Sequence, residues 1–162
     1  MTACYKRELL YRKAQGNKLK NTYEQKISCV LSNNHDNILR LQLLETDNIL
    51  KKTNMLNWQL ILSKEYHSLA DCLRTFAPEV YQEEFYTFID EDWKYCGAIK
   101  IPKHTQLNPQ YSFDKSISDE LRFIATDFST QIAIDYSVYG KSELYECTIK
   151  RSLQEIAPPK GV

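Results

Sequence analysis

The chain has 162 residues, of which 43% are hydrophobic and 26% are charged, and its formal net charge at pH 7 is zero. This length suits one domain with its own hydrophobic core. With only four Gly and five Pro, the composition excludes a disordered or low-complexity chain. We therefore expect a single globular domain over residues 1–156, followed by a flexible tail at 157–162.

Hydropathy and cysteine spacing bear on location and redox state. No apolar run approaches the roughly 18 residues that cross a bilayer, and the N-terminal residues lack the apolar core of a secretion signal. We therefore expect a cytoplasmic protein that does not contact a membrane. The five cysteines are far apart and lack the close pairs of disulfide frameworks and zinc sites, so most should be reduced, buried thiols.

Charge is unevenly distributed along the chain. Residues 1–26 contain seven Lys or Arg and two Glu, whereas residues 65–92 contain eight Asp or Glu and one Arg. Either the two segments face each other, or each covers its own part of the solvated surface. We treat residues 1–22 as a basic N-terminal segment within the domain.

In the N-terminal third, the hydrophobic pattern changes its period. Residues 2–15 fit a short basic helix that ends at Gly16. Alternation then predicts a β-hairpin, with strands at 27–31 and 39–43 around an Asn-rich turn. A helix through 38–45 is the competing interpretation, because Leu is a poor strand former. A short helix over 48–53 follows.

Two amphipathic helices are expected in the centre of the chain. Taken at 100° per residue, Trp58, Leu62, Tyr66 and later apolar residues form one stripe, which predicts a helix over 57–76. Pro78 ends that helix and begins a second, over 78–90. The second helix would end at three consecutive carboxylates, where the helix dipole disfavours them.

The C-terminal half alternates strands and one helix. Residues 95–101 are expected to be a strand, 103–115 a loop, and 117–128 a helix with a capping box at its start. Alternation on both sides of Gly140 predicts paired strands at 130–139 and 142–149. The fold class is therefore α+β: a single domain in which an antiparallel sheet of hairpins packs against three or four amphipathic helices.

The sequence offers little catalytic chemistry. His67 and Asp71 lie one turn apart on the expected helix 57–76, where a carboxylate could orient a general base, but an exposed surface pair has the same spacing. A reactive cysteine is also considered, although no basic neighbour is apparent. The isolated glycines do not form a phosphate-binding loop. A small enzyme using His67 or a Cys stays an alternative, and we assign no catalytic residue, cofactor or metal ligand.

Two binding surfaces are considered. The basic N-terminal segment mixes tyrosines with Lys and Arg, which would suit nucleic acid, although the zero net charge opposes this. Residues 79–95 combine carboxylates and aromatics, as a docking surface for a basic protein partner would. The sequence thus favours a non-enzymatic protein-binding module, of toxin-neutralising, adaptor or chaperone-like type. Its predicted contact residues are Glu83, Glu84, Tyr86, Asp90, Glu91, Asp92 and Trp93.

Overall fold

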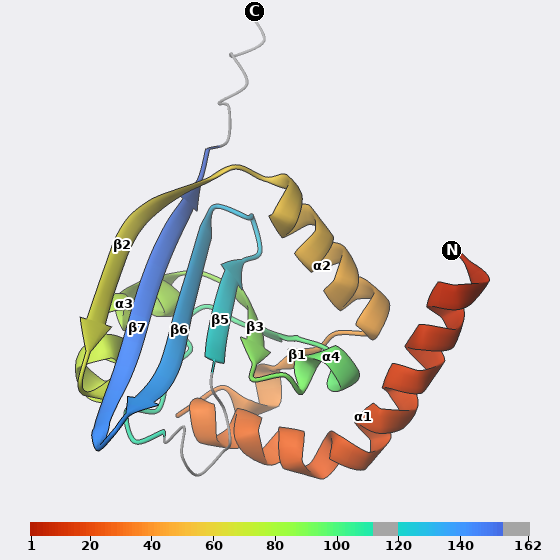
Figure 1. Cartoon of the computed structure of the whole chain (residues 1–162), viewed down its shortest axis with the longest axis horizontal. Coiled ribbons are helices and arrows are strands. Elements are labelled where there is room, and N and C mark those ends of the chain that lie inside the picture. Colours follow the sequence, from red (N-terminus) through yellow and green to blue (C-terminus); the bar gives the residue numbers. More distant parts are fainter. Residues whose placement is uncertain (112–119, 154–162) are drawn as a thin grey trace, which may run out of the picture.

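The computed structural model describes residues 1–111 and 120–153, which combine helices with one antiparallel sheet (Figure 1). The helical elements are α1 (Ala3–Val30), η1 (His35–Asn37), α2 (Leu43–Met55), α3 (Leu69–Gln82) and α4 (Trp93–Cys96). The strands are β1 (Leu39–Arg40), β2 (Trp58–Tyr66), β3 (Phe85–Ile89), β4 (Ile99–Ile101), β5 (Glu120–Ala125), β6 (Thr130–Tyr139) and β7 (Ser142–Ser152). The expected α+β class is confirmed.

The strand order within the described residues is β1-β4-β3-β5-β6-β7-β2, and every neighbouring pair is antiparallel. The predicted C-terminal hairpin is confirmed, since β6 and β7 pair from Thr130↔Arg151 to Tyr139↔Ser142. Gly140 forms its turn with φ +64°, a left-handed conformation that glycine adopts without a steric penalty. The expected strand at 95–101 is shorter, because residues 93–96 form α4 before β4 begins.

One face of the sheet is covered by α3, which lies behind the strands in Figure 1. Leu69, Leu73 and Phe76 repeat at helical spacing and are buried against the sheet. The ring of Phe76 lies 5.9 Å from that of Phe123 on β5. This face therefore contains the main hydrophobic core.

The predicted helix over 57–76 is wrong in its first half, which is strand β2 at the edge of the sheet. Trp58, Leu62 and Tyr66 are four residues apart, a spacing that suits one side of a helix. Leu62 and Tyr66 also share one face of the strand, while a register shift after Leu60 separates Trp58 from them. In β2, Leu62 pairs with Ile149 and Tyr66 with Tyr145. Pairing with β7 therefore decides what the spacing alone leaves ambiguous.

The predicted helix over 78–90 is also wrong. α3 continues through Pro78 to Gln82, and residues 85–89 form the interior strand β3. Pro78 is exposed, so the Arg74 carbonyl that loses its helical partner can bond water. β3 has buried residues on both faces, and its continuous apolar run has no strand-like alternation.

The predicted helix over 117–128 is contradicted at 120–125, which form β5, while its capping box at 116–119 lies outside the described residues. Leu121 and Phe123 are buried on one face of this strand and Ile124 on the other. Polar and apolar residues alternate from Glu120 to Phe123, but Ile124 and Ala125 are both buried, so the alternation is too short to distinguish this strand from a helix. The tail expected at 157–162 also lies outside the described part of the chain.

The N-terminal helix is twice as long as expected and includes most of the first strand of the predicted hairpin, which does not form. Tyr23, Ile27 and Val30 are buried along one side of α1. The second expected strand is reduced to β1, and α2 extends the expected helix 48–53 to residues 43–55. The alternation over 27–31 does not produce a strand, because the packing of α1 against the core stabilises a helix there.

α1 continues through Gly16 because this residue is a contact point and not a helix end. A Cβ atom at Gly16 would lie 2.2 Å from the carbonyl oxygen of Tyr95, so only glycine lets α1 approach α4 this closely. The Cys96 thiol lies 3.7 Å from the Gly16 carbonyl, and the Tyr23 hydroxyl donates to the Gly97 carbonyl at 2.6 Å. The predicted helix end at Gly16 is therefore wrong.

α1 is also joined to α2 by a charged contact. Arg12 donates two hydrogen bonds to Asp47, at 2.7 and 2.9 Å, and the Tyr5 hydroxyl donates a third at 2.5 Å. Partial burial alone would raise the pKa of Asp47, but the hydrogen bonds from Arg12 and Tyr5 outweigh it and hold this pKa below its usual value. The hydrogen bond to Asp47 and then burial raise the pKa of Tyr5 to about 12, although the charge of Arg12 opposes this.

Gly16→Ala is expected to lower the free energy of unfolding by about 1–3 kcal/mol, because the new methyl group would overlap the Tyr95 carbonyl. Urea unfolding followed by circular dichroism measures this. Asn17→Ala, at the next and exposed position of the same helix, is the control and should leave stability unchanged or slightly higher. A stability gain for Gly16→Ala would contradict the close contact.

Asp47→Asn is expected to lower the free energy of unfolding by about 1–2 kcal/mol at pH 7, since it removes the charge that Arg12 binds. A depressed carboxyl pKa stabilises the fold above about pH 4, the unfolded value, and this contribution disappears as pH falls through the folded pKa. Thermal unfolding from pH 7 to pH 2 should show the two proteins converging. Asp71→Asn, at an exposed ion pair with Arg74, should differ little from wild type throughout.

Candidate functional site

The acidic triplet expected at a helix end instead follows β3, and two of its three carboxylates bind Lys26. The Lys26 ammonium lies 2.8 Å from Asp90 and 3.0 Å from Asp92, and all three side chains are largely buried. Burial alone would lower the pKa of Lys26, but its contacts with Asp90 and Asp92 outweigh burial and raise it. These two carboxylates therefore hold α1 against the β3–α4 connection.

The two aromatic residues of the predicted contact surface pack within the protein. Tyr86 is half-buried, with its ring 6.1 Å from that of Phe128. Trp93 meets the ring of Phe88 edge-on at 5.3 Å. Both therefore belong to the small hydrophobic cluster under α2.

The remaining predicted contact residues are scattered carboxylates. Glu84 lies 3.5 Å from Lys100, and Glu91 lies 3.0 Å from Lys94. Glu83 is exposed at the end of α3. The structure thus brings Asp90 and Asp92 together on Lys26 but does not gather all seven residues into one free acidic surface.

The residues considered for catalysis are not assembled into a catalytic pair. His67 lies in the loop before α3, and Asp71 in its first turn bonds Arg74 at 3.1 Å, so the assumed helical spacing does not exist. Cys72 and Cys147 are buried, and hydrogen bonding to Cys147 together with burial raises the pKa of Cys72. Burial also raises the pKa of the half-buried Cys96.

Neither a metal-ligand group nor a membrane-spanning helix is found among the described residues. Among residues 1–111 and 120–153, no three His, Cys, Asp or Glu side chains are grouped so that they could hold a metal ion. No helix in these same ranges is long and apolar enough to cross a bilayer.

A row of four carboxylates crosses the sheet face opposite α3. Glu120 pairs with Asp135, Asp135 with Glu146, and Glu146 with Glu65, so four neighbouring strands each contribute one acidic residue. Paired residues on antiparallel strands point to the same face. We call Glu65, Glu120, Asp135 and Glu146 the acidic row.

Arg122 is a cationic partner of Glu120, the β5 member of the acidic row. Arg122 donates two hydrogen bonds to Glu120, at 2.7 and 3.0 Å. Partial burial and then the charges of Glu120 and Glu146 raise the pKa of Asp135, while Arg122 lowers it. Repulsion between carboxylates therefore adds to partial burial in opposing ionisation of Asp135.

Small side chains lie beside the acidic row and leave it accessible. On β6, β7 and β2 the adjacent register positions hold Ala133, Thr148 and Ser63, whereas on β5 the same row holds Arg122. No helix of the described chain lies in front of β6, β7 and β2 in Figure 1, whereas α2 packs against residues of β3 and β5. The row escapes sequence inspection because its members are far apart in the chain and meet only through strand register.

Lys26→Met is expected to lower the free energy of unfolding by about 3–5 kcal/mol, because it leaves Asp90 and Asp92 largely buried without a counter-charge. Chemical denaturation at pH 7 measures this loss. Lys94→Met removes the same charge from an exposed pair with Glu91 and should cost at most about 1 kcal/mol. Equal effects of the two substitutions would show that Lys26 is not a structural counter-ion.

Comparison of the chain with protein-family models, curated proteins and solved structures finds no match.

Proposed function

We propose that this protein is a non-enzymatic, cytoplasmic protein-binding module that holds a basic protein partner on its acidic row. The observation that carries the proposal is the alignment of four carboxylates across four neighbouring strands, on a sheet face that α3 does not cover. A toxin-neutralising, adaptor or chaperone-like role would use such a surface in the same way, by charge complementarity.

The cost of the acidic row to the fold supports a role in binding. Like charges directly opposite on neighbouring strands destabilise a sheet. Arg122 compensates Glu120, but Asp135 lies between two other carboxylates and its pKa is raised. A fold selected for stability alone would not need this arrangement, whereas a cationic partner would relieve the repulsion on binding.

The dimensions of the acidic row suit an extended or helical basic segment. Neighbouring strands lie about 4.8 Å apart, so four carboxylates in register span about 14 Å. Lys or Arg side chains at successive positions of a partner can reach carboxylates at this spacing. The small residues Ser63, Ala133 and Thr148 leave room for the stems of those side chains.

The surface expected from sequence, Glu83 to Trp93, stays a prediction. Asp90 and Asp92 already bind Lys26, so within this group the exposed carboxylates of Glu83 and Glu91 are those best able to meet a partner. Neither of these two belongs to the acidic row, so variants can neutralise one group of carboxylates and leave the other intact.

Neutralising the centre of the acidic row, with Asp135→Asn and Glu146→Gln together, should weaken binding of a lysine-rich decapeptide by about fivefold or more. The same variant should unfold at a slightly higher temperature, because it removes like-charge repulsion. Nuclear magnetic resonance titration measures the dissociation constant, and backbone shifts should concentrate on β5, β6, β7 and β2.

Glu83→Gln with Glu91→Gln is the matched control, since it removes the same two charges from the surface expected from sequence. It should bind the peptide like wild type. If the two variants weaken peptide binding equally, binding depends on net charge and not on the acidic row, and the proposal is overturned. Stronger weakening in the control would move the contact to the surface around residues 83–93.

A further inference from the structure

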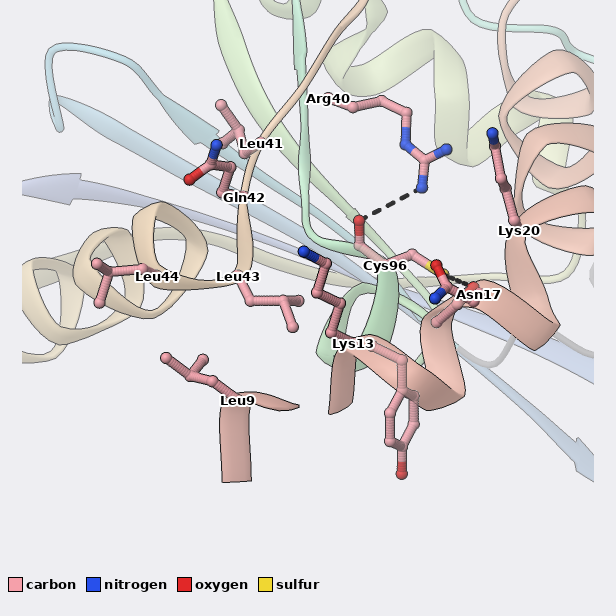
Figure 2. Close-up of a pocket in the computed structure, with 12 residues that line it drawn as sticks. Leu9, Lys13, Asn17, Lys20, Arg40, Leu41, Gln42, Leu43, Leu44 and Cys96 are labelled. Atoms are coloured by element: carbon pink, nitrogen blue, oxygen red, sulfur yellow. Dashed lines mark hydrogen bonds between the residues drawn. The ribbon is translucent and has the colours of Figure 1, made fainter. Parts of the chain in front are cut away.

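A second charged feature, unrelated to the acidic row, is a cavity of about 380 Å³ between α1 and the segment from β1 to the start of α2 (Figure 2). Its walls combine Lys13 and Lys20 of α1 with Arg40 of β1. Leu41 and Leu43 contribute apolar surface to the same cavity. A volume of this size is within the usual range for small-molecule sites.

The two lysines lie on the same side of α1 as Gly16, and both are exposed. Lys13, Gly16 and Lys20 repeat at helical spacing, so they share the side of α1 that faces β1 and α4. Within the described residues, neither lysine has a hydrogen bond or an ion pair. Figure 2 shows the Lys20 ammonium near the Arg40 guanidinium and the Lys13 ammonium near Gln42 and Leu43, and all three side chains line the cavity.

Arg40 is positioned by an ion pair with Glu24 and by a contact with the backbone. It lies 3.3 Å from Glu24, whose side chain is half exposed, and 3.4 Å from the Cys96 carbonyl. Its guanidinium also lies 5.2 Å from the centre of the Tyr23 ring. The carboxylate of Glu24 does not line the cavity.

The lining therefore carries three cations and no carboxylate among the described residues. The same cavity reaches Gln42, the residue before α2, whose side chain makes no capping hydrogen bond. The positive end of this 13-residue helix adds to the potential of the three cations. Bringing like charges together has a cost that an anion in the cavity would remove.

We propose that this cavity binds a small organic phosphate, with the phosphate on Lys13, Lys20 and Arg40 and an apolar or ring portion against Leu41 and Leu43. Phosphate oxygens accept charge-assisted hydrogen bonds from several cations at once, and Arg presents paired donors to them. The leucines offer contact area to the rest of such a molecule, which inorganic phosphate lacks.

Adenosine monophosphate and inorganic phosphate are the probes, titrated into the full chain at constant ionic strength and followed by nuclear magnetic resonance. Adenosine monophosphate should bind about tenfold more tightly than phosphate, because only it can use the apolar wall. Lys13→Gln with Lys20→Gln should weaken its binding by about tenfold or more. Lys6→Gln with Lys18→Gln removes two exposed charges of α1 outside the cavity and should change nothing.

Three results would overturn the proposal. Phosphate binding as tightly as adenosine monophosphate would exclude an organic ligand. Equal weakening by the two double variants would place binding on the general charge of α1. The third result concerns a short single-stranded RNA. If the two double variants weaken its binding equally, the ligand is nucleic acid on the surface of α1 and not a small molecule in the cavity.

Discussion

The close approach of α1 to α4 at Gly16 is the contact on which the rest of the structure depends. The absence of a side chain lets the helix backbone reach the Tyr95 carbonyl, and two further contacts then follow along the same helix. Tyr23 bonds the Gly97 carbonyl, and Lys26 binds Asp90 and Asp92. These contacts fix one side of the β3–α4–β4 connection. The basic cavity lies on the same side of α1, so its shape follows from this approach.

Two hydrophobic clusters explain why the faces of the sheet differ. The main core lies between the sheet and α3, with α1 closing one end of it. The second cluster, formed by Phe88, Ile124 and Phe128 with residues of α2, covers the opposite face only at β3 and β5. Figure 1 shows that α2 does not extend over β6, β7 and β2. That part of the sheet is the surface on which the acidic row is exposed.

The zero net charge results from separate charged regions that are only partly paired. The expectation that basic and acidic segments face each other holds for Lys26 with Asp90 and Asp92. Arg12 is similarly paired with Asp47, a carboxylate outside the acidic segment. The acidic row and the basic cavity are the places where like charges collect without sufficient compensation. Excess charge of one sign at each place is the physical basis of both proposals.

The sequence by itself determined the elements whose hydrophobic pattern fits only one type of secondary structure. The β6–β7 hairpin was predictable because alternation continues on both sides of a glycine turn, and the buried side of α3 was predictable because Leu69, Leu73 and Phe76 repeat at helical spacing. Strand β3 is buried on both faces and lacks strand-like alternation. In β5 the buried Leu121 and Ile124 are three residues apart, as on a helix, and the four-residue spacing in β2 also suits a helix.

Only the tertiary structure decided these cases, because the pairing of distant strands supplies energy that local pattern does not contain. It also decided that Gly16 is a contact and not a helix end, since the Tyr95 carbonyl that requires a glycine there is far along the chain. The acidic row shows the same limit for function: Glu65 and Glu146 are opposite each other through strand register alone. Periodicity can show which side of an element is apolar, but long-range register decides which charged residues meet.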